Sequence, residues 1–300
     1  MQRRQFLKNS GLLLGSLAFL NAKGFSSFFT NAHSVKMLTD DTGIFLEKGG
    51  TILFQLNKAG IIVVDSQFPD TAPHLIEEIK KRSSHPFRLL INTHHHGDHS
   101  AGNIVFKDLV KNVLAHANSK LNQAKSAAAN GNEHLQLYPN QVYTDVWCEK
   151  IGKEKICLNY FGPAHTNGDS IVHFKKAKVA HLGDLVFNRK HPYIDKMAGA
   201  NIGNWIVVLE RITKEYSDNT KFVCGHAGEG YETVITKKDI LAFKDYLENV
   251  LKFTNEEIKA GKTRDEILAA TTIPGSPEWT GEGIDRPLSA AYAEITANFK

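Results

Sequence analysis

Long apolar runs are missing from this 300-residue chain, and none reaches the length that a transmembrane helix needs. We therefore expect no stable membrane anchor. A basic excess is missing too, because the net charge of +4 is carried by the first 32 residues, whose charged side chains are Arg3, Arg4, Lys8 and Lys23. The remainder is neutral, so we expect no nucleic-acid partner. Repeats and low-complexity tracts are absent, and an apolar fraction of 42% predicts a packed soluble core.

The first 32 residues have the pattern of an export signal. Arg3 and Arg4 precede Phe6, Leu7 and Lys8, and a short glycine-containing apolar run follows. This arrangement resembles a twin-arginine signal peptide, so we expect the twin-arginine export machinery as a partner and a periplasmic or secreted location. The alternative is an amphipathic first helix or an uncleaved anchor. We expect the signal over residues 1–32 and the mature domain over residues 33–300.

A seven-residue stretch ending at His99 contains four histidines and one aspartate. It follows Phe87–Asn92, an apolar segment that predicts a short buried strand. Ligands collect beyond the carboxyl ends of strands in α/β sheets, so this stretch lies where a binding site is expected. In an extended loop His94 and His96 face the same way and can bind one ion, while Asp98 and His99 turn toward a second. The alternative is incidental clustering.

The spacing His94-x-His96-x-Asp98-His99 resembles the signature of the metallo-β-lactamase superfamily. Later motifs of that superfamily are matched, in the same order, by stretches that contain His165, Asp184 and His226. The resemblance covers nearly all of the expected mature chain. It implies an α/β (α+β) fold, a four-layer αβ/βα sandwich in which helices flank two mixed β-sheets.

The resemblance also implies two divalent metal ions per chain. Nitrogen-rich ligands favour zinc, with iron or manganese as alternatives. The expected ligands of the first ion are His94, His96 and His165. Those of the second ion are Asp98, His99 and His226. Asp184 is expected to bridge the ions, and His95 to face away from them as a packing residue or an outer contact of the ligands. Asp65 is expected to support the metal loop through hydrogen bonds.

The implied activity is that of a binuclear metallo-hydrolase acting on a small exported substrate. A hydroxide shared by two ions ~3.5–4 Å apart would attack an ester, lactone, thioester or amide carbonyl, with Asp98 orienting it and passing a proton. Asp184 matches glyoxalase II-like hydrolases and lactonases better than zinc β-lactamases. A basic cluster that would bind glutathione is not evident.

Three alternatives to this activity stay open. One is a β-lactamase. Another is an enzyme with a single iron that oxidises sulfur or persulfide, although the second set of ligands disfavours it. The third is an inactive binding module on the same fold.

Arg189 and Lys190, which follow Asp184, could bind a substrate carboxylate, or they could form a surface turn.

A hairpin is expected where Gly152-Lys153 separates the apolar segments Val142–Cys148 and Glu154–Tyr160. Counting outward from the turn, Cys148 faces Cys157 in a non-hydrogen-bonded pair, where Cα atoms approach to ~4.5 Å. An oxidising compartment would let a disulfide form between them. A shift of the turn by one residue would remove this pairing and leave buried free thiols.

Apolar periodicity predicts the remaining elements. Ile61–Val64 is continuously apolar, which indicates a strand buried on both faces. Helices are expected over residues 71–81, 101–110, 117–129, 201–216, 235–260, 263–270 and 289–299.

Overall fold

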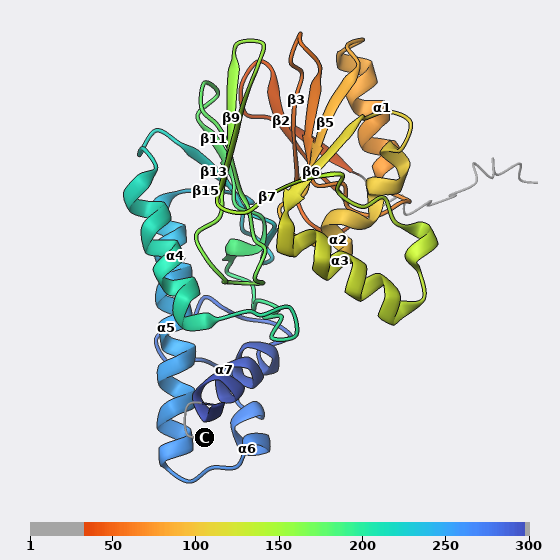
Figure 1. Ribbon diagram of the computed structural model, residues 1–300. Helices are drawn as coiled ribbons and strands as arrows, with labels where there is room; N and C mark the ends of the chain where they lie inside the picture. The colour runs from red at the N-terminus through yellow and green to blue at the C-terminus, as the bar shows by residue number, and fades with distance from the viewer. Residues whose placement is uncertain (1–32, 298–300) are drawn as a thin grey trace, which may run out of the picture. The chain divides into compact units, whose positions relative to one another are not determined.

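The computed structural model describes residues 33–297 (Figure 1). The predicted export signal lies outside this range. The first sheet has seven strands in chain order. They are β1 (Ser34–Met37), β2 (Thr42–Leu46), β3 (Ile52–Gln55), β4 (Ile61–Val64), β5 (Phe87–Ile91), β6 (Asn112–His116) and β7 (Gln141–Tyr143). β1 to β4 pair antiparallel and β4 to β7 pair parallel, so this sheet is mixed.

The second sheet has six strands in the order β15-β13-β11-β10-β9-β8. They are β8 (Val146–Ile151), β9 (Glu154–Asn159), β10 (Ile171–Phe174), β11 (Val179–His181), β13 (Lys221–Val223) and β15 (Val234–Ile235). β11 and β13 pair parallel, and the other neighbours pair antiparallel. A separate parallel pair is formed by β12 (Phe187–Asn188) and β14 (His226–Ala227).

Strand β4 is buried on both faces, as its continuous apolar sequence predicts. Ile62 and Val64 belong to a buried cluster that includes residues of β9 and β10, so they fill the space between the two sheets. Ile61 and Val63 belong to another cluster, which includes the apolar face of α1 (Ala72–Arg82). This alternation follows from the two-residue period of a strand. It places α1 on the outer face of the first sheet.

The outer face of the second sheet is covered by α4 (Ile202–Glu215) and α5 (Lys237–Lys259). Trp205 and Leu209 of α4 and Phe243 of α5 form one buried cluster with Phe222 of β13. Figure 1 shows α1 beside the first sheet and α4 with α5 beside the second. The order helix, sheet, sheet, helix confirms the predicted αβ/βα sandwich. Two further helices, α6 (Arg264–Leu268) and α7 (Asp285–Ala297), pack with α5.

Three predicted elements differ from the structure. The segment 142–148 is two strands, because the chain leaves the first sheet at Tyr143 and enters the second at Val146. The helix expected over 101–110 is a 3-10 helix, η1 (Ala101–Phe106), which follows the single turn α2 (Gly97–Ser100). The last helix begins at Asp285 rather than 289. The helix predicted over 117–129 is confirmed as α3 (Ala117–Asn130).

The hairpin of β8 and β9 has the predicted register. Ile151 pairs with Glu154, Lys150 with Lys155, and Cys148 with Cys157. The last pair is joined by a disulfide, with its Cα atoms 4.2 Å apart, which confirms the predicted bond. Cys224 is a buried free thiol. No helix within residues 33–297 combines the length and the apolar character required to cross a lipid bilayer.

Candidate metal centre

The candidate ligands lie beyond the carboxyl ends of strands from both sheets. β5 ends at Ile91, and the loop that follows carries His94 and His96 into α2, whose first turn contains Asp98 and His99. From the second sheet, β9 precedes the loop with His165, β11 precedes Asp184, and β13 precedes His226. Backbone hydrogen bonds from Thr51 to Gly225 and from Ser170 to Thr93 join these loops. The ligand-bearing loops therefore come together because the corresponding ends of the two sheets lie side by side.

The first group of donor atoms comes from His94, His96, His165 and Asp184. His96 Nδ1 lies 3.0 Å from His94 Nε2 and 2.9 Å from His165 Nε2. Asp184 Oδ2 lies 3.5 Å from His165 Nε2 and 3.9 Å from His94 Nε2. The edge of a tetrahedron around zinc with bonds of ~2.0–2.1 Å is roughly 3.3–3.4 Å long, so these separations fit one ion.

The second group contains Asp98, His99 and His226. Two of its members, His99 and His226, lie close to Asp184 of the first group. His226 Nε2 lies 3.0 Å from Asp98 Oδ2 and 3.5 Å from Asp184 Oδ2. His99 Nε2 lies 3.0 Å from Asp184 Oδ1 and 3.7 Å from Asp98 Oδ2. Asp184 Oδ1 thus faces the second group, while Oδ2 lies between the two groups, so the carboxylate contacts both, as expected of a bridging ligand.

Two observations show that this donor set suits cations. Asp184 Oδ1 is buried, and apart from the close approach of His99 Nε2 at 3.0 Å it has no hydrogen-bond partner within residues 33–297. Burial also lowers the pKa of His94, and it lowers the pKa of His165 to about 3. Both imidazoles are therefore neutral at physiological pH, which is the form that binds metal.

The carboxylates of the centre create a demand for positive charge. Burial opposes protonation of His99, but Asp184, Asp98 and Asp65 together raise its pKa well above the usual value. Burial would likewise raise the pKa of Asp98, yet the charge of His99 and a hydrogen bond from His226 lower it to about 2. Three carboxylates around one imidazole make a strongly anionic pocket that divalent cations can neutralise.

Asp65 supports the metal loop, as the resemblance implied. Its carboxylate accepts hydrogen bonds from Thr93 N and Thr93 Oγ1, both at 2.7 Å, and contacts His99 Nδ1 at 2.8 Å. Asp65 is fully buried and has a φ of 67°, in the left-handed region that non-glycine residues avoid. The contact with Nδ1 leaves Nε2 of His99 facing the candidate metal position.

The turn that carries Asp184 is held from several sides. Gly183 N donates to His181 Nδ1, and His181 Nε2 contacts Thr51 O at 2.8 Å. Trp205 Nε1 of α4 donates to Leu185 O at 2.9 Å. The space around Asp184 is also tight, because a Cβ atom at Gly225 would lie 2.0 Å from Asp184 Oδ1. These contacts fix the bridging position.

The sequence did not identify Asp195, although its side chain contacts a ligand. His96 Nε2 lies 2.9 Å from Asp195 Oδ2, so His96 presents Nδ1 to the centre. His95, which was expected to face away, places Nε2 3.6 Å from the same oxygen. His165 is fixed in a similar way, since its Nδ1 contacts Tyr193 O at 2.8 Å. No spacing pattern in the sequence identifies Asp195 as a partner of His96, because the two residues are 99 positions apart.

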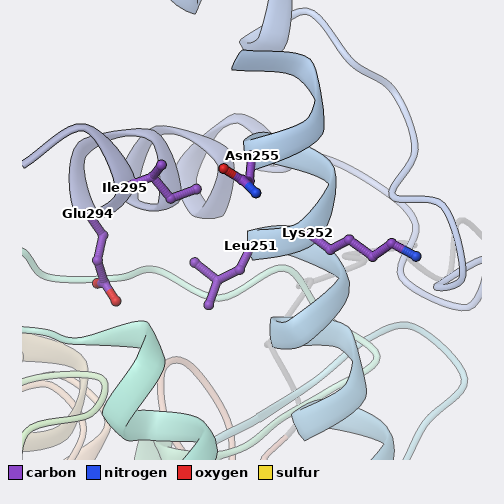
Figure 2. A pocket seen from close by; sticks show the side chains of 5 residues that line it. All are labelled: Leu251, Lys252, Asn255, Glu294 and Ile295. Atoms are coloured by element: carbon purple, nitrogen blue, oxygen red, sulfur yellow. The ribbon is translucent and has the colours of Figure 1, made fainter. Parts of the chain in front are cut away.

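The loop with Asp195 is tied to the last helix. Lys196 Nζ lies 2.8 Å from Glu294 Oε2, and it also donates to Ala200 O. Glu294 accepts hydrogen bonds from the backbone N–H groups of Ile202 and Gly203, in the first turn of α4. Figure 2 shows Glu294 on α7, where its side chain lines a 330 Å³ pocket together with Leu251 of α5. α7 therefore supports one wall of the centre through Glu294.

Arg189 and Lys190 do not have the setting expected of substrate-binding residues. The Arg189 guanidinium lies 3.1 Å from Asp239 and 3.2 Å from Glu278, and it stacks on Trp279. Lys190 is exposed at the surface. These contacts favour the alternative interpretation, a structural turn, because the positive charge of Arg189 is already matched by two carboxylates.

Comparison with known proteins gives the centre a family context. Metallo-beta-lactamase IND-1 from Chryseobacterium indologenes is 25% identical over 183 residues, which cover 60% of this chain and 72% of that protein. Metallo-beta-lactamase type 2 from Bacillus cereus is 27% identical over 172 residues, covering 57% of this chain and 64% of that protein. The chain therefore matches about two thirds of the length of these relatives.

Solved structures show the same fold at lower identity. A metallo-beta-lactamase from Pontibacter korlensis superposes with a TM-score of 0.62 at 18% identity, over 73% of this chain and all of that chain. The sec-alkylsulfatase Pisa1 from Pseudomonas sp. gives 0.70 at 12% identity, over 89% of this chain and 52% of that chain. The family model of the Metallo-beta-lactamase superfamily matches residues 50–226, and this span contains all seven candidate ligands. By fold, by ligand order and by this match, the chain is a member of the metallo-β-lactamase superfamily and a metallo-hydrolase.

Proposed function

We propose that this protein hydrolyses a small ester, lactone or thioester with two divalent metal ions, most simply zinc, held on either side of Asp184. The observation that carries the proposal is the sharing of Asp184 between two donor groups. One oxygen lies 3.0 Å from His99, and the other lies 3.5 Å from both His165 and His226. An enzyme with a single iron would have no use for the second group.

When bound, a pair of divalent ions supplies Lewis acids that polarise a carbonyl oxygen and lower the pKa of water toward neutrality. The roles of the two carboxylates, Asp184 and Asp98, follow from how far each is exposed to solvent. The Asp184 side chain is 4% exposed and serves to hold the centre together. The Asp98 side chain is 30% exposed, so it is the carboxylate that a water molecule can reach. Asp98 orients this water and accepts its proton on a carboxylate oxygen.

Hydrolysis of β-lactams is the second candidate. The relatives named as metallo-beta-lactamases support it at 25% and 27% identity. The carboxylate at position 184 argues against it, because Asp184 resembles the ligand of glyoxalase II-like hydrolases and lactonases more than that of zinc β-lactamases. The same chemistry of carbonyl attack would serve both substrate classes, so the pocket around the centre determines which is used.

Export by the twin-arginine pathway is part of the proposal. Arg3-Arg4 before an apolar run supports it, and the disulfide between Cys148 and Cys157 suits an oxidising compartment. Replacing Arg3 and Arg4 with lysine should hold the full-length precursor inside the cell. Arrival of the doubly substituted protein in the periplasm would refute this pathway.

The test of the hydrolase is elemental analysis combined with a substrate panel of lactones, thioesters, β-lactams and phosphodiesters. We expect two tightly bound metal ions per chain and turnover of a lactone or thioester. Asp184→Asn keeps the shape of the side chain but removes its charge, so metal and activity should fall together while the fold stays intact. One tightly bound iron, or turnover of β-lactams alone, would overturn the assignment.

A further inference from the structure

A second group of metal-type ligands lies outside the metal centre. It consists of His33, at the start of the described chain, Glu47, just after β2, and His74, in the first turn of α1. One ring nitrogen of each histidine and a carboxylate oxygen of Glu47 all lie within 4.8 Å of one another. Within residues 33–297, none of these three residues forms a hydrogen bond or ion pair with a ligand of the metal centre.

Glu47 is the key member of this group because its carboxylate is nearly buried. Its side chain is only 7% exposed, and its two oxygens both lie 3.0 Å from His74 Nδ1. Within residues 33–297, no lysine or arginine forms an ion pair with it. A carboxylate taken out of water needs a matching positive charge. A single imidazole provides that charge only when it is protonated, whereas a divalent cation provides it while the imidazoles are neutral.

His33 is held where it can complete the group. Its ring stacks on Phe45, with ring centres 5.3 Å apart, and on His74, with ring centres 5.5 Å apart. His33 Nε2 lies 3.6 Å from Glu78 Oε1, which is itself held by Lys81. Glu78 follows His74 by one helical turn on α1, so both side chains project from the same helix face.

We propose that His33, Glu47 and His74 form a second divalent-cation site of the zinc type, with Glu78 orienting the His33 ring. Two imidazoles and one carboxylate are a donor set that zinc uses, and they leave one position for water. A carboxylate beside a ligand histidine is the usual outer contact of such sites. The bound ion would connect the chain just before β1, an edge strand, to α1 on the outer face of the first sheet.

The test compares zinc stoichiometry in matched variants of the full-length protein. Wild type, His74→Ala, Glu47→Gln and His134→Ala are dialysed at the same buffered free Zn²⁺ concentration, and bound zinc is counted by elemental analysis. His134 is exposed and lies outside the group, so it controls for the loss of one histidine. We expect His74→Ala and Glu47→Gln each to bind one zinc fewer than wild type and His134→Ala, with unchanged hydrolase activity.

A thermal measurement adds a readout that does not depend on activity. Added Zn²⁺ should raise the Tm of Asp184→Asn, whose metal centre is impaired, and this rise should vanish when Glu47→Gln is added. Equal zinc counts in wild type, His74→Ala and Glu47→Gln would overturn the proposal, as would a zinc-dependent Tm rise that survives Glu47→Gln. Either result would leave the proposed hydrolase untouched, because that proposal rests on Asp184.

Discussion

His99 Nδ1 and Asp65 Oδ2 lie 2.8 Å apart, and neither side chain is exposed to solvent. Their contact determines which nitrogen of His99 faces the candidate metal. Asp65 maintains it from a backbone conformation with a φ of 67°, which costs on the order of 1 kcal/mol or more. Such strain persists only where surrounding contacts compensate it, and Asp65 receives two further hydrogen bonds from Thr93.

Asp65→Asn should weaken metal binding by roughly 10–100-fold, the usual effect of losing an outer contact to a ligand histidine. The asparagine fits the space but presents a neutral amide to His99. Competition with a chelator of known affinity measures the change. The control is Asp108→Asn, which alters an exposed aspartate at the surface. Equal chelator resistance in Asp65→Asn and wild type would contradict the assigned role.

Asp195→Asn should act on the first donor group in a similar way. Asp195 Oδ2 fixes His96 through Nε2 at 2.9 Å, so its replacement lets the imidazole rotate or change tautomer. We expect metal occupancy and kcat to fall by roughly 10–100-fold, with a smaller change in KM. Asp195→Glu should not restore activity, because the longer side chain displaces the carboxylate. Full activity in Asp195→Asn would exclude this positioning role.

Glu294→Gln should destabilise the protein by about 1–2 kcal/mol, because its carboxylate accepts two N–H bonds at the start of α4 and pairs with Lys196. Urea unfolding measures the loss. The matched control, Glu215→Gln, removes an exposed pair with Arg211 on α4 and should cost only a few tenths of a kcal/mol. Similar losses of unfolding free energy in both variants would show that the contact of Glu294 with α4 stabilises the protein no more than an exposed ion pair does.

Removing the disulfide by Cys148→Ser with Cys157→Ser should lower the free energy of unfolding by about 2–3 kcal/mol, since the bond closes a short loop with a sequence separation of 9. Thiol titration of the denatured, unreduced wild type checks the pairing directly. One reactive thiol, from Cys224, is expected. Three reactive thiols would mean that the bond does not form in the protein.

His173 should make stability sensitive to acid. Burial lowers its pKa from 6.5 to about 4, so the unfolded chain binds more protons than the folded chain between these values. The contribution of His173 is therefore fully present above pH 6.5 and is lost as the pH falls to 4, by roughly 1–2 kcal/mol after allowance for its partial exposure. Between pH 6.5 and 4, the free energy of unfolding of His173→Gln should fall less steeply with decreasing pH than that of wild type. The same pH dependence in both proteins would refute this role of His173.

The candidate site could be predicted where ligands lie close together in the sequence. His94, His96, Asp98 and His99 fall within six residues after an apolar strand, so spacing alone joins them. The Cys148–Cys157 pairing was also predictable, because a two-residue turn sets the register of the hairpin. In both cases the decisive geometry is local.

Contacts that depend on the packing of distant segments were not predictable. Asp195 reaches His96 only because the loop before α4 folds back over the centre, and nothing in its neighbourhood marks it. The passage from the first sheet to the second between Tyr143 and Val146 was missed for a related reason, because alternation identifies strands but not the sheet they join. Arg189 looked available for a substrate because Asp239 and Glu278 are far away in the sequence.

The shared position of Asp184 makes the two halves of the sandwich thermodynamically dependent on one another. The loop after β5 belongs to the first sheet, whereas Asp184 and His226 follow strands of the second, so full metal affinity exists only while the sheets are docked. By mass action, free metal at 100 times its dissociation constant would stabilise the docked state by about 2.7 kcal/mol. Metal supply would then govern the lifetime of the folded protein as well as its chemistry.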